Sequence, residues 1–189
     1  MPSRRENPPS VSADLLATAS DLLTGTLGTC PDRWLLVDVA GQRLLLVTGG
    51  TPRRTWPVST AAAGLDARED SSGTPPGVHR IVERIGLGSP PGTEFSSRLP
   101  TGRTLPLDDL PGEPDRDLIL SRILILEGMQ EGVNRGPGID SRERYIYLHG
   151  TNHEDQLGQP VSGGCVRLAN RDIITVCDLV REGDPVVII

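Results

Sequence analysis

The first hydrophobic pattern along the chain is helical. Between residues 12 and 24 the apolar side chains recur at helical spacing: Leu15, Leu16, Ala19, Leu22 and Leu23. This spacing predicts one amphipathic helix, with Ser12 as its N-cap and an end near Gly25. The helix lies in an expected N-terminal extension, residues 1–33.

From residue 34 onward the apolar residues form short β-type runs instead. The runs WLLVDVA and RLLLVT flank Gly41-Gln42, which predicts a hairpin. Further strand-like runs are RTWPVST, GVHRIVERI, LILSRILILEG, YIYLHG and the terminal PVVII. Long connections rich in Gly, Pro and Ser separate them at 61–77 and 86–117, and such loops could cover a site.

A second helix is predicted close to the C-terminus. Asn170 can cap it, Asp172 suits its positive end, and one apolar stripe follows: Ile173, Val176, Cys177 and Val180. The predicted fold is therefore mainly β with a few short helices, in a single domain over residues 34–189.

Composition narrows the class of protein. The chain of 189 residues has a net charge of −6, with arginines scattered among acids, so we expect no binding to nucleic acid. No apolar run approaches the roughly 20 residues that span a bilayer, so we expect no membrane insertion.

Asp14 and Asp21 interrupt the N-terminal apolar segment. It is a poor secretion signal, and we expect a cytoplasmic protein if residue 1 is the native start.

The chemistry-bearing residues are few and widely separated. The three cysteines, Cys30, Cys165 and Cys177, form no CxxC pair and favour reduced thiols. His149 ends the run YIYLH, where Gly150 would let the chain turn away sharply, and SGGC follows with Cys165. A neighbouring imidazole is the usual activator of a thiol, and glycines allow backbone N–H groups to approach an oxyanion. From spacing alone, a small buried cysteine and an ordinary strand-end histidine are the preferred interpretation, and a Cys–His pair is the alternative.

The other histidines and the loop arginines have simpler interpretations. His149 and His153 are four apart, but HGTNH holds a glycine and follows a strand, so we expect no metal site there and a solvent-facing His153. His79 is expected to be a satisfied strand histidine. Arg135, Arg142 and Arg144 belong either to a solvated charged loop or to a carboxylate-binding surface.

The whole string resembles a known family. YIYLHGTN, LGQPVS and SGGCVRL, followed by DI, are similar to the active-site signature of the L,D-transpeptidase catalytic-domain (YkuD-like) family. VDVAGQRLLLV resembles its first hairpin, WPVST its next strand and TPPGVHRI its Thr-Pro-x-Gly segment. The resemblance covers about residues 34–189 and implies a YkuD-like mixed β-sandwich.

The resemblance also implies a role for each motif position. Cys165 would be the nucleophile and His149 its base, oriented by a main-chain carbonyl near Gly150. The backbone N–H groups of Gly163, Gly164 and Cys165 would surround the oxyanion. Three further positions would bind substrate or shape the loop: Gly150, Ser162 and Arg167. No cofactor is implied.

Two positions depart from the family pattern. Gly163 stands where many members have a histidine, and Ala61-Ala62 follow Ser59-Thr60 where the family has Gly-Lys. Both changes remove side chains that could contact a substrate.

The implied substrate is a peptidoglycan tetrapeptide stem or muropeptide, cleaved between meso-diaminopimelate and the terminal D-alanine. A cytoplasmic location favours hydrolysis, an L,D-carboxypeptidase of muropeptide recycling. The alternatives are an L,D-transpeptidase that forms crosslinks and a non-catalytic muropeptide-binding domain. The sequence indicates no oligomeric state.

Overall fold

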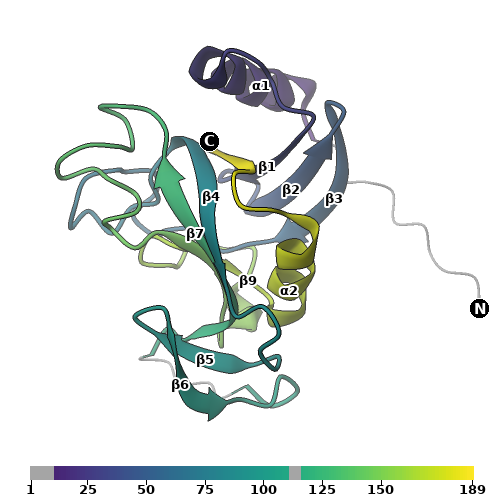
Figure 1. Ribbon diagram of the computed structural model, residues 1–189, viewed down its shortest axis with the longest axis vertical. Helices are drawn as coiled ribbons and strands as arrows, with labels where there is room; N and C mark the ends of the chain where they lie inside the picture. Colours follow the sequence, from purple (N-terminus) through teal and green to yellow (C-terminus); the bar gives the residue numbers. More distant parts are fainter. Residues whose placement is uncertain (1–10, 111–115) are drawn as a thin grey trace, which may run out of the picture.

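The computed structural model describes residues 11–110 and 116–189 (Figure 1). The N-terminal part contains α1 (Ala13–Leu27), β1 (Arg33–Asp38), β2 (Arg43–Thr48), β3 (Thr51–Pro57), β4 (Gly77–Ile85), β5 (Thr93–Ser96) and β6 (Leu99–Thr104). The rest contains β7 (Ile119–Gly128), β8 (Tyr147–Gly150), the 3₁₀ helix η1 (Glu154–Gln156), β9 (Val166–Leu168), α2 (Asn170–Leu179) and β10 (Pro185–Ile188). The mainly β prediction is confirmed.

The strands form one mixed sheet. Its order is β3-β2-β1-β10-β4-β7-β5-β6, and β8 pairs with β7 and with β9. The pairs β1–β10 and β8–β9 are parallel, whereas the other pairs are antiparallel. Side chains from strands as distant as β3 and β8 share the main core. The two layers of the expected sandwich are therefore parts of one continuous sheet that bends around this core.

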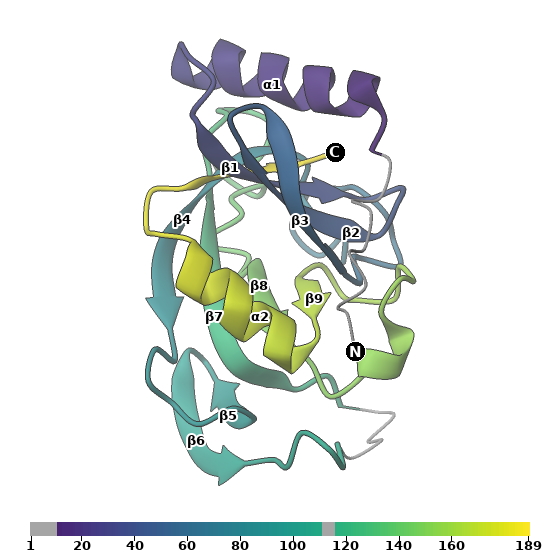
Figure 2. The same cartoon turned by 90° about the vertical axis from the view of Figure 1, so that its right-hand side faces the viewer.

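The strongly apolar runs of β1 and β2 are explained by burial on both faces. Leu35 and Val37 point into the main core, whereas Trp34 and Leu36 point to the opposite face, which α1 covers. Helix α1 lies across this end of the sheet, and α2 packs on β7 and β8 (Figure 2). A strand covered on both faces loses the alternation of a half-exposed strand.

The predicted cap of α1 is confirmed, but its predicted end is wrong. The Ser12 hydroxyl accepts a hydrogen bond from the Leu15 N–H at 3.0 Å. The helix continues through Gly25 to Leu27 and stops at Gly28, which adopts a left-handed conformation (φ 80°). A glycine inside a helix costs stability but does not end it when neighbouring turns pack well, here through the buried Ala19 and Leu23.

The connection expected at 86–117 contains an additional hairpin, β5–β6. Ser96 pairs with Leu99, so Ser97 and Arg98 form a two-residue turn with positive φ at both positions. All of β6 is exposed. An exposed edge strand needs no apolar alternation, so the hydrophobic pattern could not reveal it.

The predicted apolar stripe of α2 is confirmed, but its predicted cap is wrong. Ile173, Val176 and Cys177 are buried. Asn170 is the first helical residue, and its backbone N–H and its side-chain amide both donate to Glu154 Oε1, at 2.7 and 2.8 Å. The cap therefore comes from η1, through a contact that local sequence cannot indicate.

Candidate active site

The parallel pairing of β8 with β9 brings the histidine and cysteine motifs together. His149 lies opposite Arg167 in this register. Leu148 and Val166 face the main core, so the next positions along each strand face the other way. Cys165 packs beside Tyr147 on that opposite face. Residues remote in sequence thus meet on one face of two adjacent strands.

The strand that carries the histidine is shorter than the run YIYLH predicts. It begins at Tyr147, and Tyr145 lies in a turn with φ 57°. A bulky residue in this left-handed region is strained. The turn points the Tyr145 carbonyl toward the thiol of Cys165.

The Cys165 thiol lies between two backbone groups. Its Sγ–H donates to the Tyr145 carbonyl oxygen at 3.4 Å, and the Tyr147 N–H donates to Sγ at 3.4 Å. Burial raises the pKa of this thiol to about 11, although the Tyr147 N–H favours the thiolate. The thiol is therefore protonated near neutral pH, and a reaction requires a base.

His149 has the properties of such a base. The ring is buried, and Nδ1 lies 2.8 Å from the Gly150 carbonyl oxygen, the main-chain partner that the family pattern implies. A carbonyl only accepts, so Nδ1 carries the proton and Nε2 has a lone pair. Burial lowers the pKa of the imidazole, a change that the Asp117 charge and the Gly150 hydrogen bond oppose. The neutral imidazole can therefore take a proton.

The structure requires a glycine at position 150 because neighbouring groups pack closely against it. The sequence suggested a different reason, a sharp turn of the chain. A Cβ at this position would lie 2.6 Å from the Leu120 carbonyl oxygen and 2.5 Å from Asn170 Oδ1. Its φ lies outside the positive region that glycine alone favours. The glycine lets β7 and α2 approach the end of β8.

The SGGC segment forms a tight turn around the nucleophile. Ser162 Oγ donates to the Cys165 carbonyl oxygen at 2.6 Å and accepts from the Gly164 N–H at 3.2 Å. Gly164 has φ 134°, and Thr74 Oγ1 donates to its carbonyl oxygen at 2.9 Å. Gly163 is exposed, and a Cβ there would meet nothing within 4 Å. The loop before β4 thus packs directly against the site, and the open position is Gly163.

Arg167 is buried beside the histidine and forms an ion pair that the sequence did not reveal. Its Nη2 lies 2.7 Å from Asp117 Oδ2, whereas its Nε and Nη1 are buried without a hydrogen-bond partner. Nothing in the local sequence distinguishes Asp117 from other loop acids. Its proximity arises because it lies just before β7, next to β8 in the sheet.

Two other sequence expectations, those for His79 and His153, have clear outcomes. His79 is buried and bonded to Gly77 and Ser141, as predicted. His153 is not solvent-facing: it is 8% exposed, and Nε2 lies 3.0 Å from the Arg116 carbonyl oxygen. Within residues 11–110 and 116–189, no group of three His, Cys, Asp or Glu side chains could hold a metal ion.

Arg144 connects the loop before β8 to the loop before β4. It donates to the carbonyl oxygens of Asp66 and Gly73 at 3.1 and 3.0 Å. A recess of about 310 Å³ lies beside it and is lined by Glu69, Asp70, Ser72, Glu143, Arg144, Tyr145, Ile146 and Gly163. This recess reaches the motif at its open position.

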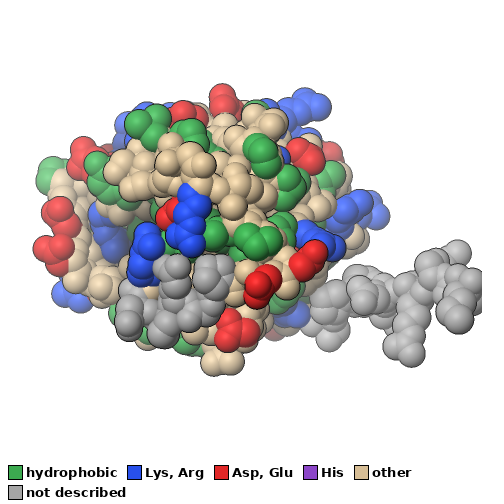
Figure 3. All heavy atoms as spheres, turned by 90° about the horizontal axis from the view of Figure 1, so that it is seen from below, with side chains coloured by type: hydrophobic (Ala, Val, Ile, Leu, Met, Phe, Trp, Pro, Cys, Tyr) green, Lys and Arg blue, Asp and Glu red, His purple; other side chains and the backbone are tan. Residues whose placement is uncertain are grey.

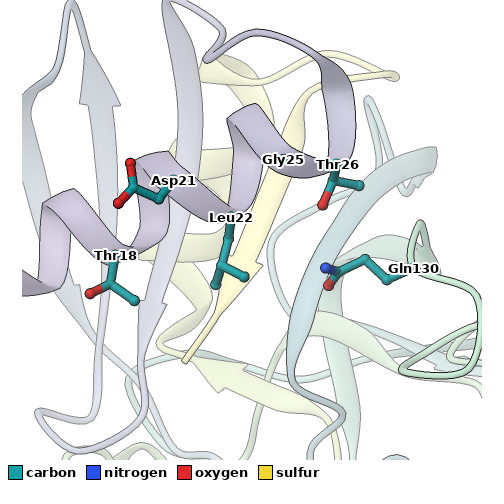
Figure 4. A pocket seen from close by; sticks show the side chains of 6 residues that line it. All are labelled: Thr18, Asp21, Leu22, Gly25, Thr26 and Gln130. Atoms are coloured by element: carbon teal, nitrogen blue, oxygen red, sulfur yellow. The ribbon is translucent and has the colours of Figure 1, made fainter.

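A larger hollow lies beside α1. It has a volume of about 410 Å³ and is lined by Thr18, Asp21, Leu22, Gly25, Thr26 and Gln130 (Figure 4). These side chains come mainly from α1 and contribute none of the motif residues. On the face drawn in Figure 3, positive and negative side chains are interspersed.

Comparison with solved structures shows the same fold. L,D-transpeptidase 3 from Mycobacterium tuberculosis, in complex with a faropenem-derived adduct, matches with a TM-score of 0.51 and 17% identity over 85% of this chain and 61% of that chain. A variant of the Enterococcus faecium L,D-transpeptidase matches with a TM-score of 0.51 and 12% identity over 84% of this chain and 50% of that chain. At this identity the likeness concerns the fold.

Sequence comparison assigns the family. YkuD proteins from Bacillus licheniformis and Bacillus subtilis are each 42% identical to this chain, over 41 and 46 residues. These matches span 22% and 24% of the chain and 25% and 28% of the relatives. The family model described as L,D-transpeptidase catalytic domain matches residues 32–188, which include the whole site and leave α1 outside. The chain therefore belongs to the L,D-transpeptidase catalytic domain (YkuD) family, a family of cysteine enzymes.

Proposed function

We propose that the protein is an L,D-carboxypeptidase that removes the terminal D-alanine from peptidoglycan tetrapeptide stems. The observation that carries the proposal is geometric: the Cys165 thiol lies on the same face as the buried ring of His149, whose Nδ1 is held by the Gly150 carbonyl oxygen. Burial raises the pKa of the thiol and lowers that of the imidazole, which favours a neutral pair. Such a pair suits nucleophilic acyl transfer, in which thiolate forms only as the base takes its proton.

The proposed reaction has two steps. His149 Nε2 accepts the thiol proton while Sγ bonds to the carbonyl carbon of the L-centre of meso-diaminopimelate. The C–N bond to D-alanine then breaks, and the imidazolium returns the proton to the leaving amine. Water, deprotonated by His149, attacks the thioester, and the thiol leaves with the proton. The products are tripeptide stem and D-alanine.

The backbone of the SGGC turn is proposed to stabilise the oxyanion. The N–H groups of Gly163, Gly164 and Cys165 follow one another in this turn. The Gly164 N–H donates to Ser162 Oγ, so an oxyanion must share or replace that bond. Ser162 would thereby hold the turn until the substrate enters.

Arg167 is proposed to attract the carboxylate of the leaving D-alanine. Its guanidinium lies opposite His149 in the strand register, and two of its nitrogens have no hydrogen-bond partner. An arginine fork suits a carboxylate. Asp117 would then be the charge that occupies Arg167 between catalytic cycles.

Water is favoured over an amine as acceptor because the site lacks acceptor-side contacts. Gly163 leaves open space next to the nucleophile, and Ala61-Ala62 replace the lysine-bearing pattern. A transpeptidase must bind a second stem and exclude water from the thioester, whereas a hydrolase needs only to admit water. The cytoplasmic location expected from the sequence, where soluble muropeptides are available, is part of this proposal.

The test is incubation of the purified protein with disaccharide tetrapeptide, followed by mass spectrometry. We expect loss of one D-alanine, abolished in Cys165→Ala and retained in Cys30→Ser, whose thiol is exposed and far from the motif in sequence. Stem dimers, or exchange of D-alanine for an added D-amino acid, that form faster than tripeptide would instead establish the transpeptidase. Binding of the muropeptide without any conversion would establish a binding domain.

A further inference from the structure

A cluster of one arginine and two tyrosines lies beside the nucleophile; both tyrosines belong to the string YIYLHGTN, whereas the arginine, Arg98, lies outside the family motif. Arg98, at the tip of the β5–β6 hairpin, donates from Nε to the Tyr147 hydroxyl at 2.8 Å. Its guanidinium carbon lies 4.9 Å from the ring centroid of Tyr145 and 5.6 Å from that of Tyr147. The two rings contact each other edge to face, with centroids 6.5 Å apart. One side chain therefore contacts both tyrosines.

The same two tyrosines provide both backbone contacts of the thiol. The Tyr145 carbonyl oxygen accepts from Cys165 Sγ, and the Tyr147 N–H donates to it. The side chains of these residues contact Arg98, while their main chain contacts the sulfur. A displacement of the two rings that shifts their main chain would therefore change how the thiol is held.

Two strained turns meet at this contact. Arg98 has φ 70° and Tyr145 has φ 57°, although neither is glycine. Such conformations cost free energy and persist where surrounding contacts hold them. Arg98 also donates to the Arg142 carbonyl oxygen at 3.4 Å, within the loop that leads to Tyr145. The hairpin tip and the loop before β8 thus stabilise each other's unusual backbone.

We propose that Arg98 is a positioning residue for the nucleophile: it holds Tyr145 and Tyr147 so that their backbone groups fix the Cys165 thiol. The proposal rests on the proposed function only in taking Cys165 as the reacting group. Arg98 acts through the tyrosines and does not touch the sulfur. The β5–β6 hairpin, which the apolar pattern of the sequence did not reveal, thereby has a role at the site.

The test measures the rate of Cys165 alkylation by iodoacetamide from pH 7 to 11.5, in a Cys30→Ser background, with peptide mapping. In Arg98→Ala we expect an alkylation rate about three- to tenfold lower and a higher pH midpoint of the rate profile. This size corresponds to the loss of one cation–π contact and one hydrogen bond. The midpoint rises because a displaced Tyr147 N–H no longer favours the thiolate.

Matched variants separate positioning from general destabilisation. Arg103→Ala removes the same charge from the same hairpin, where the side chain pairs with Glu94, and should leave rate and midpoint unchanged. Arg98→Lys should restore part of the rate. Tyr147→Phe removes only the hydroxyl acceptor and should be intermediate, and combining it with Arg98→Ala should add little.

The outcomes remain distinct from those of the muropeptide assay. A normal alkylation rate and midpoint in Arg98→Ala, whether or not its Tm falls, would overturn the positioning role. If Arg98→Ala does not fold, Arg98→Lys and Tyr147→Phe carry the test, and wild-type profiles in both overturn it. If the wild-type protein does not hydrolyse muropeptide, the proposed function is rejected. The alkylation result, which does not depend on hydrolysis, remains valid.

Discussion

The molecule buries two faces of one sheet in different ways. Under α1, the outer face of β1 and β2 is filled by large apolar side chains such as Trp34, Leu36 and Val47. On the outer face of β8 and β9, burial encloses His149 and Arg167. Burial of the first face stabilises the fold by removing apolar area from water. Burial of the second face desolvates polar groups, which costs stability, and leaves two guanidinium nitrogens of Arg167 without a hydrogen-bond partner. The contrast separates stability from reactivity.

The largest expected effect concerns the reactive face. His149→Gln should lower hydrolysis of the tetrapeptide stem by about 10²- to 10⁴-fold, the contribution of a positioned general base. The free energy of unfolding should change much less, because glutamine keeps a polar group near the Gly150 carbonyl. Parallel measurements of kcat and of denaturant unfolding test this. If the fall in kcat is accompanied by a fall in the free energy of unfolding large enough to account for it, the contrast between the two faces is wrong.

The apolar face should respond in the opposite way. Leu36 is fully buried, and Leu36→Ala should lower the free energy of unfolding by about 2–5 kcal/mol through lost burial and a residual cavity. Activity per folded molecule should be retained. Leu99, 69% exposed on β6, is the matched control, and Leu99→Ala should stay within about 0.5 kcal/mol of the parent.

Acid should weaken the fold through His79, a buried histidine outside the reactive face. Burial lowers its pKa to about 4 from an ordinary value of 6.5. Below pH 6.5 His79 binds a proton in the unfolded chain but stays neutral in the folded protein. The free energy of unfolding therefore falls as the pH drops toward 4. The loss is about 3 kcal/mol at 1.36 kcal/mol for each pKa unit.

Chemical unfolding at pH 7 and pH 4 tests this dependence. His79→Gln should flatten the difference between the two pH values, whatever its effect on absolute stability. If the variant shows the full loss between pH 7 and pH 4, another group is responsible.

The smallest expected effect concerns the end of α1. Ser12→Ala removes the acceptor of the Leu15 N–H and should cost about 1 kcal/mol of unfolding free energy. Hydrolysis and thiol alkylation should not change. Ser12→Asp, which keeps an acceptor at the N-cap, should restore the stability, and a failure to do so would mean that the cap contributes through another contact.

Prediction from sequence succeeded where local pattern and physical requirement coincide. The apolar runs located β1, β2, β4 and β7, and Ser12 was a correct cap because capping is decided within three residues. It failed where an element has no apolar side to bury, as in β6, or where a distant group decides, as at Asn170. The YIYLH run suggested a longer strand because alternation alone cannot detect the turn at Tyr145.

The candidate site was predictable in part. The positions of Cys165 and His149 followed from a motif, and a main-chain partner for the histidine was expected near Gly150. Asp117 and Arg98 were not predicted, because each reaches the site from a loop or hairpin tip far from the motif in sequence. No local spacing rule describes contacts of that range.

The sequence by itself determined the strand and helix periods, the glycine-rich turn and the reactive residue types, because these depend on neighbours along the chain. Only the tertiary structure decided which face each motif residue occupies and how burial changes its acidity. The parallel register of β8 and β9 places His149 opposite Arg167, and enclosure by the sheet raises the pKa of Cys165 while lowering that of His149. Desolvation depends on every element that excludes water from a group, and the sequence order of those elements does not reveal it.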